Sequence, residues 1–443
     1  MQQTIHDVNL KKLVAEAIAI AKKEGASEVE VSANLDDGFT SIVRMGEIDT
    51  VEYQRDREID ITVYFGHKKG SATTTEIKPE SLMITIKKAC DIAKFTGEDP
   101  YNGLADKALM AQYLPDLSLY HPWDLSAEQG VELALACEAK ARQLDKRITN
   151  SDSVSVTSFQ AKYVYGNSHG FLGEINSTQH EISCILIAEQ DEEMERDFAY
   201  SLARDPKDLI AIEKIADEAV SKTISRLGAR KIKTCKVPVI FIAEEACSLW
   251  GHFVSAIAGS QLYRKSSFLL DCLEKQIFPE FIHLYEDPYL LKGMGSTAFD
   301  SDGVATTKKY FISKGFLKSY CLGAYSARKL GMQTTGNADG VHNLIIEPGE
   351  KDLPQLLKLM DRGLLVTEVM GQGVNILTGD YSRGARGFWV EQGKIQFPVS
   401  EITIAGNLQT MFRSLIAVGN DIDYRGNIHT GSVLLGQLTV AGN

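Results

Sequence analysis

Apolar residues in the first half of this chain recur at two spacings, one typical of helices and one of strands. A helical period of about 3.6 residues runs through 10–23, and Gly25 then ends the pattern. The same period returns in 79–94, in 126–144 after a serine that suits a helix cap, and in 208–227. We therefore predict a helix in each of these segments.

Runs rich in β-branched and aromatic residues fill the two intervals between paired helices. In the first interval, the predicted strands are 28–35, 38–43, 48–53 and 58–65. In the second interval, the predicted strands are 148–159, 161–167, 170–177 and 180–191. Polar stretches such as Asp36-Asp37-Gly38 and Gln54-Arg55-Asp56 separate neighbouring strands as predicted turns. The order helix, strands, helix thus occurs twice, which hints at a remote internal duplication without a residue-level repeat.

The second half of the chain alternates short apolar runs with many glycines. Glycine supplies positive φ angles and tight bends, so this pattern is typical of curled sheets or of a partly open barrel. One hairpin is clear, because 388–391 and 394–399 flank the two-residue turn Gln392-Gly393. We predict a short helix or buried strand at 411–418 and the final strand at 432–440.

These patterns predict an α+β protein, with two helix and antiparallel-sheet units followed by a β-rich, glycine-punctuated C-terminal domain. The length of 443 residues exceeds one ordinary core, since about 100–200 residues per domain is typical. A stretch bearing Pro and Gly separates the first two units. The predicted parts are an N-terminal domain at 1–98, a linker at 99–125, a central domain at 126–230 and a C-terminal domain at 231–443.

Composition and charge narrow the classes of function. A formal net charge of −12 argues against general nucleic-acid binding, because a polyphosphate requires clustered Lys and Arg. No apolar run approaches the roughly 20 residues that span a bilayer, and the first residues show no secretory signal. We therefore expect a cytoplasmic protein that binds neither nucleic acid nor membrane. Its seven scattered cysteines lack Cys-x-x-Cys spacing and are expected to be reduced thiols.

Two segments carry a specific resemblance. A strand running into a helix at 237–259 places Glu244-Glu245-Ala-Cys-Ser-Leu249 at the start of the helix. Farther along, 378–408 reads TGDYSRGARGFWVEQGKIQFPVSEITIAGNL. With these segments the whole chain resembles the PmbA/TldD family. In that family, TldD carries His-Glu-x-x-x-His and binds zinc, whereas its paralogue lacks the ligands and pairs with it. This chain resembles the paralogue.

Zinc hydrolysis needs three protein ligands and one open position, where the metal activates water. Carried over from the family's zinc-binding pattern, the first histidine falls on Glu244, the general base on Glu245 and the second histidine on Leu249. The third ligand, a cysteine, falls on Thr430. A leucine cannot replace an imidazole, and a hydroxyl is a weak zinc ligand beside a thiolate. We therefore expect no catalytic residue and no metal or other cofactor in this chain, with zinc held by the TldD partner.

A narrower alternative remains open around the same helix. Glu245 would be the base of any residual site, and His429 next to Thr430 could join Glu244 and Glu245 around a different metal. The simpler interpretation places Glu245 favourably at a helix start and His429 in a turn.

The resemblance also implies partners and roles. This chain would pair with a TldD-like subunit in a hollow heterodimer, where unstructured peptides enter and are cut at the partner's zinc. Implied roles include removal of leader peptides and degradation of an unstable antitoxin, and the family is also called modulator of DNA gyrase. Two alternatives are an independent metal-dependent peptidase and a non-enzymatic protein that binds gyrase. A homodimer of the isolated chain is a further expectation, because sheet-dominated halves often offer open edges.

A polar and aromatic cluster near the predicted hairpin is the remaining candidate site. Its members are Asp380, Tyr381, Arg383, Arg386 and Trp389. Arginine forks onto carboxylates and aromatic faces cover a peptide chain, so the cluster could line a peptide groove or a subunit seam. A structural turn held by Asp380 and Arg383 explains these residues equally well.

Overall fold

The structure is a computed structural model in which residues 9–442 are described. Residues 1–8 and 443 lie outside this part, and with them most of the segment used to exclude a secretory signal. The N-terminal half repeats one arrangement twice, a helix, three strands and a helix. The first copy comprises α1 (Leu10–Lys23), β1 (Glu28–Arg44), β2 (Glu47–Phe65), β3 (Lys68–Thr74) and α2 (Pro79–Phe95). The second comprises α3 (Ala127–Leu144), β4 (Ile148–Asn167), β5 (Leu172–Gln190), β6 (Glu193–Ala203) and α4 (Ile212–Ser225).

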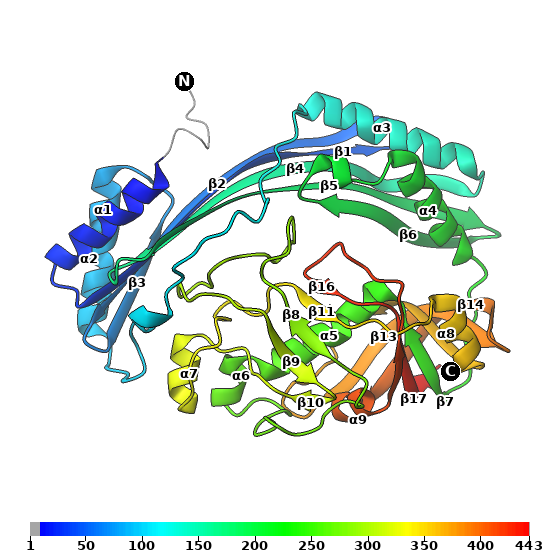
Figure 1. The fold of residues 1–443 in the computed structure, drawn as a ribbon. Helices are drawn as coiled ribbons and strands as arrows, with labels where there is room; N and C mark the ends of the chain where they lie inside the picture. The colour runs from blue at the N-terminus through cyan, green and yellow to red at the C-terminus, as the bar shows by residue number, and fades with distance from the viewer. Residues whose placement is uncertain (1–8, 443) are drawn as a thin grey trace.

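The strands of both copies form one sheet, in the order β3-β2-β1-β4-β5-β6. The seam between the copies is an antiparallel pairing of β1 with β4, from Glu30 opposite Asn167 to Val43 opposite Val154. Figure 1 shows this sheet arching over the C-terminal half of the chain. The N-terminal and central units therefore build a single wall above the C-terminal domain.

The strands of this wall are longer than the sequence pattern predicts. The predicted turns Asp36-Asp37-Gly38 and Gln54-Arg55-Asp56 were wrong, because the two stretches lie opposite each other inside β1 and β2. Gly38 is required by close packing and not by a turn, because a Cβ atom there would lie 2.3 Å from the Ser158 carbonyl oxygen. Strands β4 and β5 likewise run unbroken through their predicted breaks, and β3 and β6 are absent from the sequence prediction.

The four helices of this half are confirmed, and they cover the same face of the sheet. Every buried residue on β1 has an odd number, from Val29 to Val43, so these side chains share one face along the strand. Helices α1 and α2 pack on one end of that face, and α3 and α4 pack on the other. A capping box of Ser126 and Gln129 begins α3. Side chains of the segment before α3 lie over the face between the helix pairs.

Five strands of the C-terminal domain close into a barrel. They pair in the order β14-β13-β12-β7-β17, and β14 pairs again with β17 to complete the ring. The predicted α+β class and the curled C-terminal sheet are thereby confirmed. The predicted hairpin turn has positive φ at Gln392 (54°) and Gly393 (66°). The barrel strands are β7 (Cys235–Phe241), β12 (Gly363–Met370), β13 (Asp380–Glu391), β14 (Lys394–Asn407) and β17 (Val433–Ala441), with β15 (Leu415–Val418) added beside β17.

A second sheet of short strands shares one apolar core with the barrel, in the order β10-β9-β8-β11-β16. Its strands are β8 (Leu284–Glu286), β9 (Lys309–Ser313), β10 (Phe316–Leu317), β11 (Leu344–Ile346) and β16 (Ile428–His429). The helices of this half are α5 (Ala243–Ile257), α6 (Gly259–Tyr263), α7 (Ala324–Leu330), α8 (Leu353–Met360) and α9 (Leu408–Arg413). The buried residues of α5 belong to that core, so this helix lies at the junction of barrel and second sheet.

Charged side chains tie the arched sheet to the barrel. Arg226, at the end of α4, pairs with Asp197 on β6 and, at 2.6 Å, with Glu368 on β12. Arg386 on β13 pairs with Glu195 on β6 at 3.1 Å. The Arg226–Glu368 and Arg386–Glu195 pairs join the two halves of the chain, so these two contacts hold the arch over the barrel.

None of the helices in residues 9–442 combines the length and the apolar character that crossing a bilayer requires. All seven cysteines are free thiols, and four of them are buried. Burial raises the pKa of the Cys247 thiol, on α5, to about 12. That thiol is therefore protonated and poorly nucleophilic at neutral pH.

Candidate functional site

The candidate motif lies at the start of α5, directly after β7 of the barrel. Strand β7 pairs with β12 on one side and with β17 on the other, which holds its end in place. Helix α5 then carries Glu244 and Glu245 in its first turn, where the positive end of the helix dipole stabilises carboxylates. Its apolar side chains turn into the core, and the buried ones are Ala246, Leu249, Trp250, Phe253, Ala256 and Ile257.

Two of the positions that correspond to zinc ligands belong to this core. Leu249 is 2% exposed and packs within the main apolar cluster. Thr430 is fully buried, and its hydroxyl accepts a hydrogen bond from Trp250 Nε1 at 2.9 Å. The same hydroxyl donates to the Gly431 carbonyl oxygen at 3.0 Å. The structure thus uses one position for apolar packing and the other for an internal hydrogen bond.

Protein cations neutralise Glu244, the position of the first zinc ligand. Its carboxylate pairs with Arg425 at 2.5 Å and with Lys222 on α4 at 3.0 Å. Arg425 also pairs with Asp423 at 2.8 Å, and its guanidinium lies 4.3 Å from the centre of the Tyr200 ring on β6. A divalent metal bound to Glu244 would be repelled by both cations at close range.

Glu245 lies in a different electrostatic environment. Its carboxylate accepts a hydrogen bond from the Val369 backbone N–H of β12 at 3.2 Å. Burial raises the pKa of this carboxyl to about 7, with the nearby Glu368 and Glu244 charges adding to the rise and Arg383 opposing it. A carboxyl of this pKa exchanges a proton near neutral pH, which is the property that a general base or acid requires.

Replacing Glu245 by glutamine is expected to flatten the pH dependence of stability. The pKa of the folded state is raised from 4.5 to about 7, so the stability that this group contributes is full below pH 4.5 and lost as pH rises through 7. Over that window the wild type should lose on the order of 2–3 kcal/mol relative to the variant. Urea unfolding of both proteins at several pH values measures the difference. Glu213→Gln, in the first turn of α4, is the exposed control, and parallel curves for wild type and Glu245→Gln would contradict the prediction.

The hydrogen-bond partner of His429 is a backbone carbonyl and not one of the two glutamates. It sits in β16 rather than in a turn, and this strand pairs in parallel with β11. Its Nε2 lies 3.1 Å from the Gly426 carbonyl oxygen, and its ring meets the edge of Tyr424. Burial lowers the pKa of this imidazole, which keeps it neutral near pH 7. Its contacts are those of a packed histidine.

The charged groups around Glu244 line a cavity of about 310 Å³ between the arch and the barrel. Its wall includes Tyr200 from β6, Lys222 from α4, both glutamates of α5 and Asp423. Sequence analysis missed Lys222 and Arg425, which pair with Glu244, and Asp423, which pairs with Arg425, because only the fold brings these residues together and no local spacing marks them. The cavity is thus a mixed-charge pocket.

Part of the second candidate cluster lies inside the barrel. Tyr381 is 1% exposed and Trp389 is 6% exposed, and both pack in the main core. The Trp389 Nε1 donates to Glu391 Oε1 at 3.0 Å. The Tyr381 ring meets the His252 ring edge-on, with 6.0 Å between their centres. In this structure, these two aromatic side chains are therefore part of the packed core.

The polar members of that cluster have separate partners. Asp380 is exposed and accepts a hydrogen bond from Thr378 Oγ1 at 2.7 Å, which holds the turn before β13. Arg383 Nη2 donates to the Val369 carbonyl oxygen at 3.3 Å. Arg386 reaches the arch through its pair with Glu195, as described above.

The residues present do not fit a zinc ion. No group of three or more His, Cys, Asp and Glu side chains within residues 9–442 is arranged to share a metal. Glu244 is neutralised by Arg425, Leu249 lies in the core, and the Thr430 hydroxyl is engaged on both sides. We therefore derive no chemical step through a metal in this chain.

Comparison with known proteins covers nearly the whole chain. Models of three domains described as PmbA/TldA metallopeptidase match, with domain 1 at residues 29–93, the central domain at 120–227 and the C-terminal domain at 234–442. The Escherichia coli O157:H7 protein named Metalloprotease PmbA is 48% identical over 438 residues, which is 98% of this chain and 97% of that protein.

Solved structures agree with this match. A crystal structure of a Bacteroides thetaiotaomicron protein, described as a candidate modulator of DNA gyrase, has a TM-score of 0.93 and 29% identity and covers 99% of this chain and 100% of its own. The structure of TldE from Thermococcus kodakarensis has a TM-score of 0.86 at 21% identity, with 97% of this chain and 100% of its own covered. At that identity, the second likeness concerns the fold alone.

Proposed function

Because this chain belongs to the PmbA/TldD metallopeptidase family, we propose that it is the zinc-free subunit of a two-chain peptidase. The observation that carries the proposal is the pairing of Arg425 and Lys222 with Glu244, which puts protein cations where a catalytic metal would need a ligand. Leu249 in the core supports the same conclusion. A TldD-like partner would hold the zinc and cut the peptide bond.

In this proposal, the chain helps to enclose the chamber and to control which peptides enter it, and it does not catalyse the cleavage. The arched sheet and the barrel would form one side of a chamber that admits unstructured peptides and excludes folded proteins. Extended peptides are readily held by backbone hydrogen bonds to a sheet edge, which requires no particular side chain. Leader-peptide removal and antitoxin degradation in the cytoplasm are the roles that we propose for the assembled pair.

Purified alone, the chain is expected to contain far less than one zinc per molecule and to cleave no peptide. Elemental analysis after dialysis measures the metal, and cleavage of an unstructured peptide is assayed with each subunit omitted in turn. Activity should require both chains. Glu245→Gln in this chain is the matched variant, and it should leave the activity of the pair unchanged. Stoichiometric zinc together with peptidase activity of this chain alone would overturn the proposal.

A second candidate function is an independent peptidase in which Glu245 acts as the general base. The raised pKa of its carboxyl, about 7, favours this alternative. It predicts that the chain alone hydrolyses peptides with an added metal and that Glu245→Gln abolishes the activity. The third alternative, a non-enzymatic protein that binds gyrase, would instead recover gyrase without a TldD-like chain from a cell extract.

A further inference from the structure

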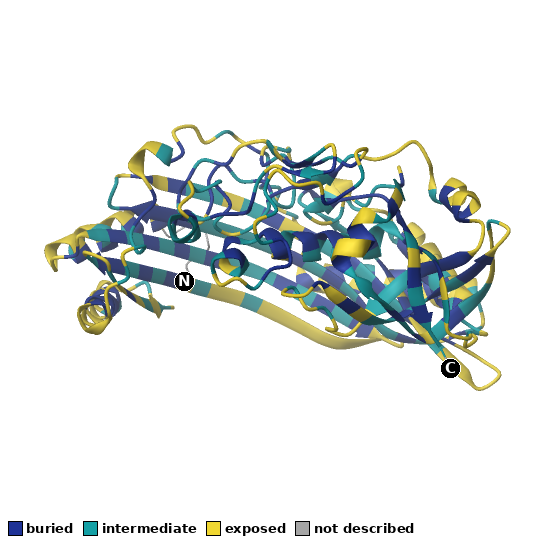
Figure 2. Cartoon of the chain, turned by 90° about the horizontal axis from the view of Figure 1, so that it is seen from below, coloured by how far each residue is buried: buried dark blue, intermediate teal, exposed yellow. Residues whose placement is uncertain are grey.

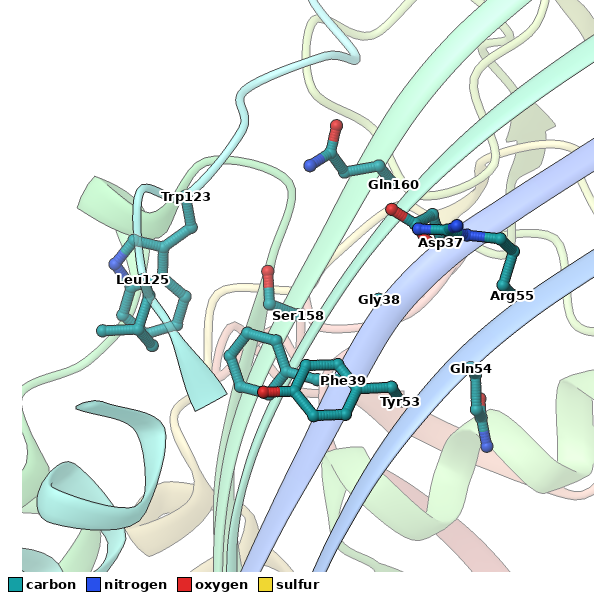
Figure 3. Close-up of a pocket in the computed structure, with 10 residues that line it drawn as sticks. All are labelled: Asp37, Gly38, Phe39, Tyr53, Gln54, Arg55, Trp123, Leu125, Ser158 and Gln160. Atoms are coloured by element: carbon teal, nitrogen blue, oxygen red, sulfur yellow. Dashed lines mark hydrogen bonds and ion pairs between the residues drawn. The ribbon is translucent and has the colours of Figure 1, made fainter. Parts of the chain in front are cut away.

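A cavity of about 750 Å³ on the helix-covered face of the arch carries charged groups that are already compensated. It lies beside β2, where Figure 2 shows an exposed strand, in yellow, along one rim of the sheet. Figure 3 shows Arg55 next to Asp37 at this cavity, and Arg55 Nε donates to Asp37 Oδ1 at 2.8 Å. These two are the charged residues among the described residues that line it. The cavity therefore presents no uncompensated charge to a ligand.

A smaller cavity, of about 440 Å³, differs in its charge. It lies in the C-terminal domain, where α5 passes into α6 and where α7 begins. Its lining includes the carboxylates of Asp302 and Asp339 and the amide of Asn337. None of the described residues that line it is a Lys, Arg or His. We call it the acidic cavity.

Asn337 in the acidic cavity has one polar atom without a partner. The residue is 2% exposed, and its Nδ2 donates to both carboxylate oxygens of Glu286, at 3.0 Å each, and to the Gly340 carbonyl oxygen at 2.9 Å. Because all three neighbours are acceptors, they fix the amide with its nitrogen toward them. The Oδ1 atom is left without a hydrogen-bond partner in residues 9–442, although a buried oxygen normally has one. Since Asn337 lines the cavity, a donor held there would satisfy this oxygen.

The two carboxylates of the acidic cavity also lack a Lys or Arg partner within the described residues. Asp302 Oδ2 accepts a backbone hydrogen bond at the start of α7, at 2.7 Å, and Asp339 Oδ1 lies 3.8 Å from His342 Nε2. Arg328 is near Asp302, but it donates to backbone carbonyl oxygens in the segment before α3, at 2.9 Å. Partial burial raises the pKa of both carboxyls. A bound cation would therefore stabilise both in the ionised form.

The acceptors of the acidic cavity favour a primary ammonium group over other cations. An ammonium group has three N–H donors and no acceptor, and the cavity offers acceptors from three residues, Asp302, Asp339 and Asn337. A guanidinium group binds best to both oxygens of one carboxylate, and one oxygen of Asp302 is already engaged. A metal ion is disfavoured as well, because no group of three or more His, Cys, Asp and Glu side chains within residues 9–442 is arranged to share one.

Two tyrosine rings give the acidic cavity an apolar part of its wall. The ring centres of Tyr263 and Tyr325 are 5.7 Å apart, and the rings meet edge to face. Arg264 already lies 5.6 Å from the centre of the Tyr263 ring, and Lys329 lies 5.4 Å from that of Tyr325. These rings therefore suit the aliphatic part of a ligand rather than a further cation. The cavity volume is within the range of roughly 300–1,000 Å³ that is usual for small-ligand sites.

We propose that the acidic cavity binds the primary ammonium group of a peptide, with the adjoining chain against the two tyrosine rings. Asp302 and Asp339 supply the opposite charge, and Asn337 Oδ1 accepts the third hydrogen bond. The ammonium group is a free N-terminus or a lysine side chain, since both have the same donors. The choice of a peptide rests on the proposed function, whereas the binding is a property of this chain alone. The isolated chain can fail to bind while the assembled pair still cleaves peptides, so the two proposals can fail separately.

Peptide probes test the ligand chemistry on the isolated, full-length chain. Trialanine amide carries an ammonium group at its N-terminus, and its acetylated form carries none. The acetylated form with lysine in place of the last alanine carries one on its side chain. In a ligand-observed NMR titration, at least one ammonium peptide should bind at least tenfold more tightly than acetylated trialanine amide. The peptide that binds identifies the source of the ammonium group. Equal binding of the acetylated trialanine amide, or no binding of either ammonium peptide, would overturn the proposal.

Substitutions locate the binding in the acidic cavity. Asp302→Asn and Asp339→Asn keep the side-chain shape and remove one charge, and each should weaken binding of the ammonium peptide about tenfold. Asp339 is exposed, so its variant is expected to fold. Asp217→Asn, exposed on α4 of the arch, is the matched control and should leave the affinity unchanged. Ser260→Phe narrows the cavity from an exposed position without changing the charge, and it should also weaken binding. Equal effects of all three aspartate variants would reduce the binding to general charge attraction and refute the site.

Calcium tests the remaining competitor, a metal ion. At the concentration of the peptide, calcium should not displace the ammonium peptide from the wild-type chain. Displacement that occurs in the wild type and is lost in Asp339→Asn would assign the acidic cavity to a metal and contradict the proposal.

Discussion

Replacing Arg226 by methionine is expected to lower the free energy of unfolding by about 3–5 kcal/mol, because it leaves a buried carboxylate without its partner. Arg226 and Asp197 are 8% and 9% exposed, and the same guanidinium reaches Glu368 at 2.6 Å. Removing the cation leaves two carboxylates near each other, and one of them, Asp197, is shielded from water. Urea denaturation followed by circular dichroism measures the loss.

Two companion variants separate charge from packing at this contact. Asp197→Leu combined with Arg226→Met removes both charges and should recover most of the lost stability, because no unpaired buried charge remains. Arg196→Met removes a cation next to Asp197 that pairs with the exposed Asp152 at 2.8 Å. That change should cost less than about 1 kcal/mol. An Arg226 variant as stable as the Arg196 variant would show that the cluster of Arg226, Asp197 and Glu368 contributes little to stability.

Replacing Leu249 by histidine, which restores one residue of the zinc pattern, is expected to destabilise the chain by about 3 kcal/mol or more. The change removes apolar burial and puts a polar ring into a closed core, and each effect costs about 1–3 kcal/mol. Leu249 is 2% exposed among aromatic and aliphatic neighbours. Thermal unfolding of the variant should show a lower melting temperature. Zinc analysis of the same sample should show no bound metal.

The matched control for this change keeps the shape of the side chain. Leu249→Met is apolar and similar in volume, so it should cost less than about 1.5 kcal/mol. If Leu249→His folded with wild-type stability and bound zinc tightly, the site would be a latent metal centre, and Arg425 would have to leave Glu244. The pair of variants therefore tests whether the motif has become part of the core.

Glu244 and Glu245 are neighbours in the chain but lie in contrasting electrostatic environments. Glu244 is compensated by Arg425 and Lys222 and serves the contact between helix, arch and barrel. Glu245 is half-buried beside β12, where Arg383 only partly offsets the burial, and the pKa of its carboxyl rises to about 7. The titration of Glu245 thus reflects burial next to like charges, which a structural role also produces.

Sequence patterns identified most elements but not where the strands continue. The long β1 could have been recognised, because the alternation of apolar residues from Val29 through Leu35 resumes at Phe39 and Val43 with the same odd numbering. A turn at Asp36-Asp37-Gly38 had no reason to preserve that parity. By its residue type Gly38 predicts a turn, whereas in the structure it allows the close approach of the Ser158 carbonyl oxygen.

The candidate site was predictable in part. The corresponding positions Glu244, Leu249 and Thr430 followed from the resemblance to the PmbA/TldD family, and two of them, Leu249 and Thr430, carry residue types unsuited to a zinc ligand. The cations that pair with Glu244 did not follow from any pattern. Lys222 belongs to α4 and Arg425 to the segment before β16, and only the packing of these elements brings them to α5.

The sequence by itself determined the four helices of the N-terminal half and the hairpin at Gln392-Gly393, because periodicity and turn chemistry are local properties. Only the tertiary structure decided that two units share one sheet, that β14 meets β17 to close the barrel, and that protein cations neutralise Glu244. Each of these depends on contacts between residues far apart in the chain. These contacts are stabilised by packing and by charge compensation between distant residues, so they cannot be predicted from local spacing along the sequence.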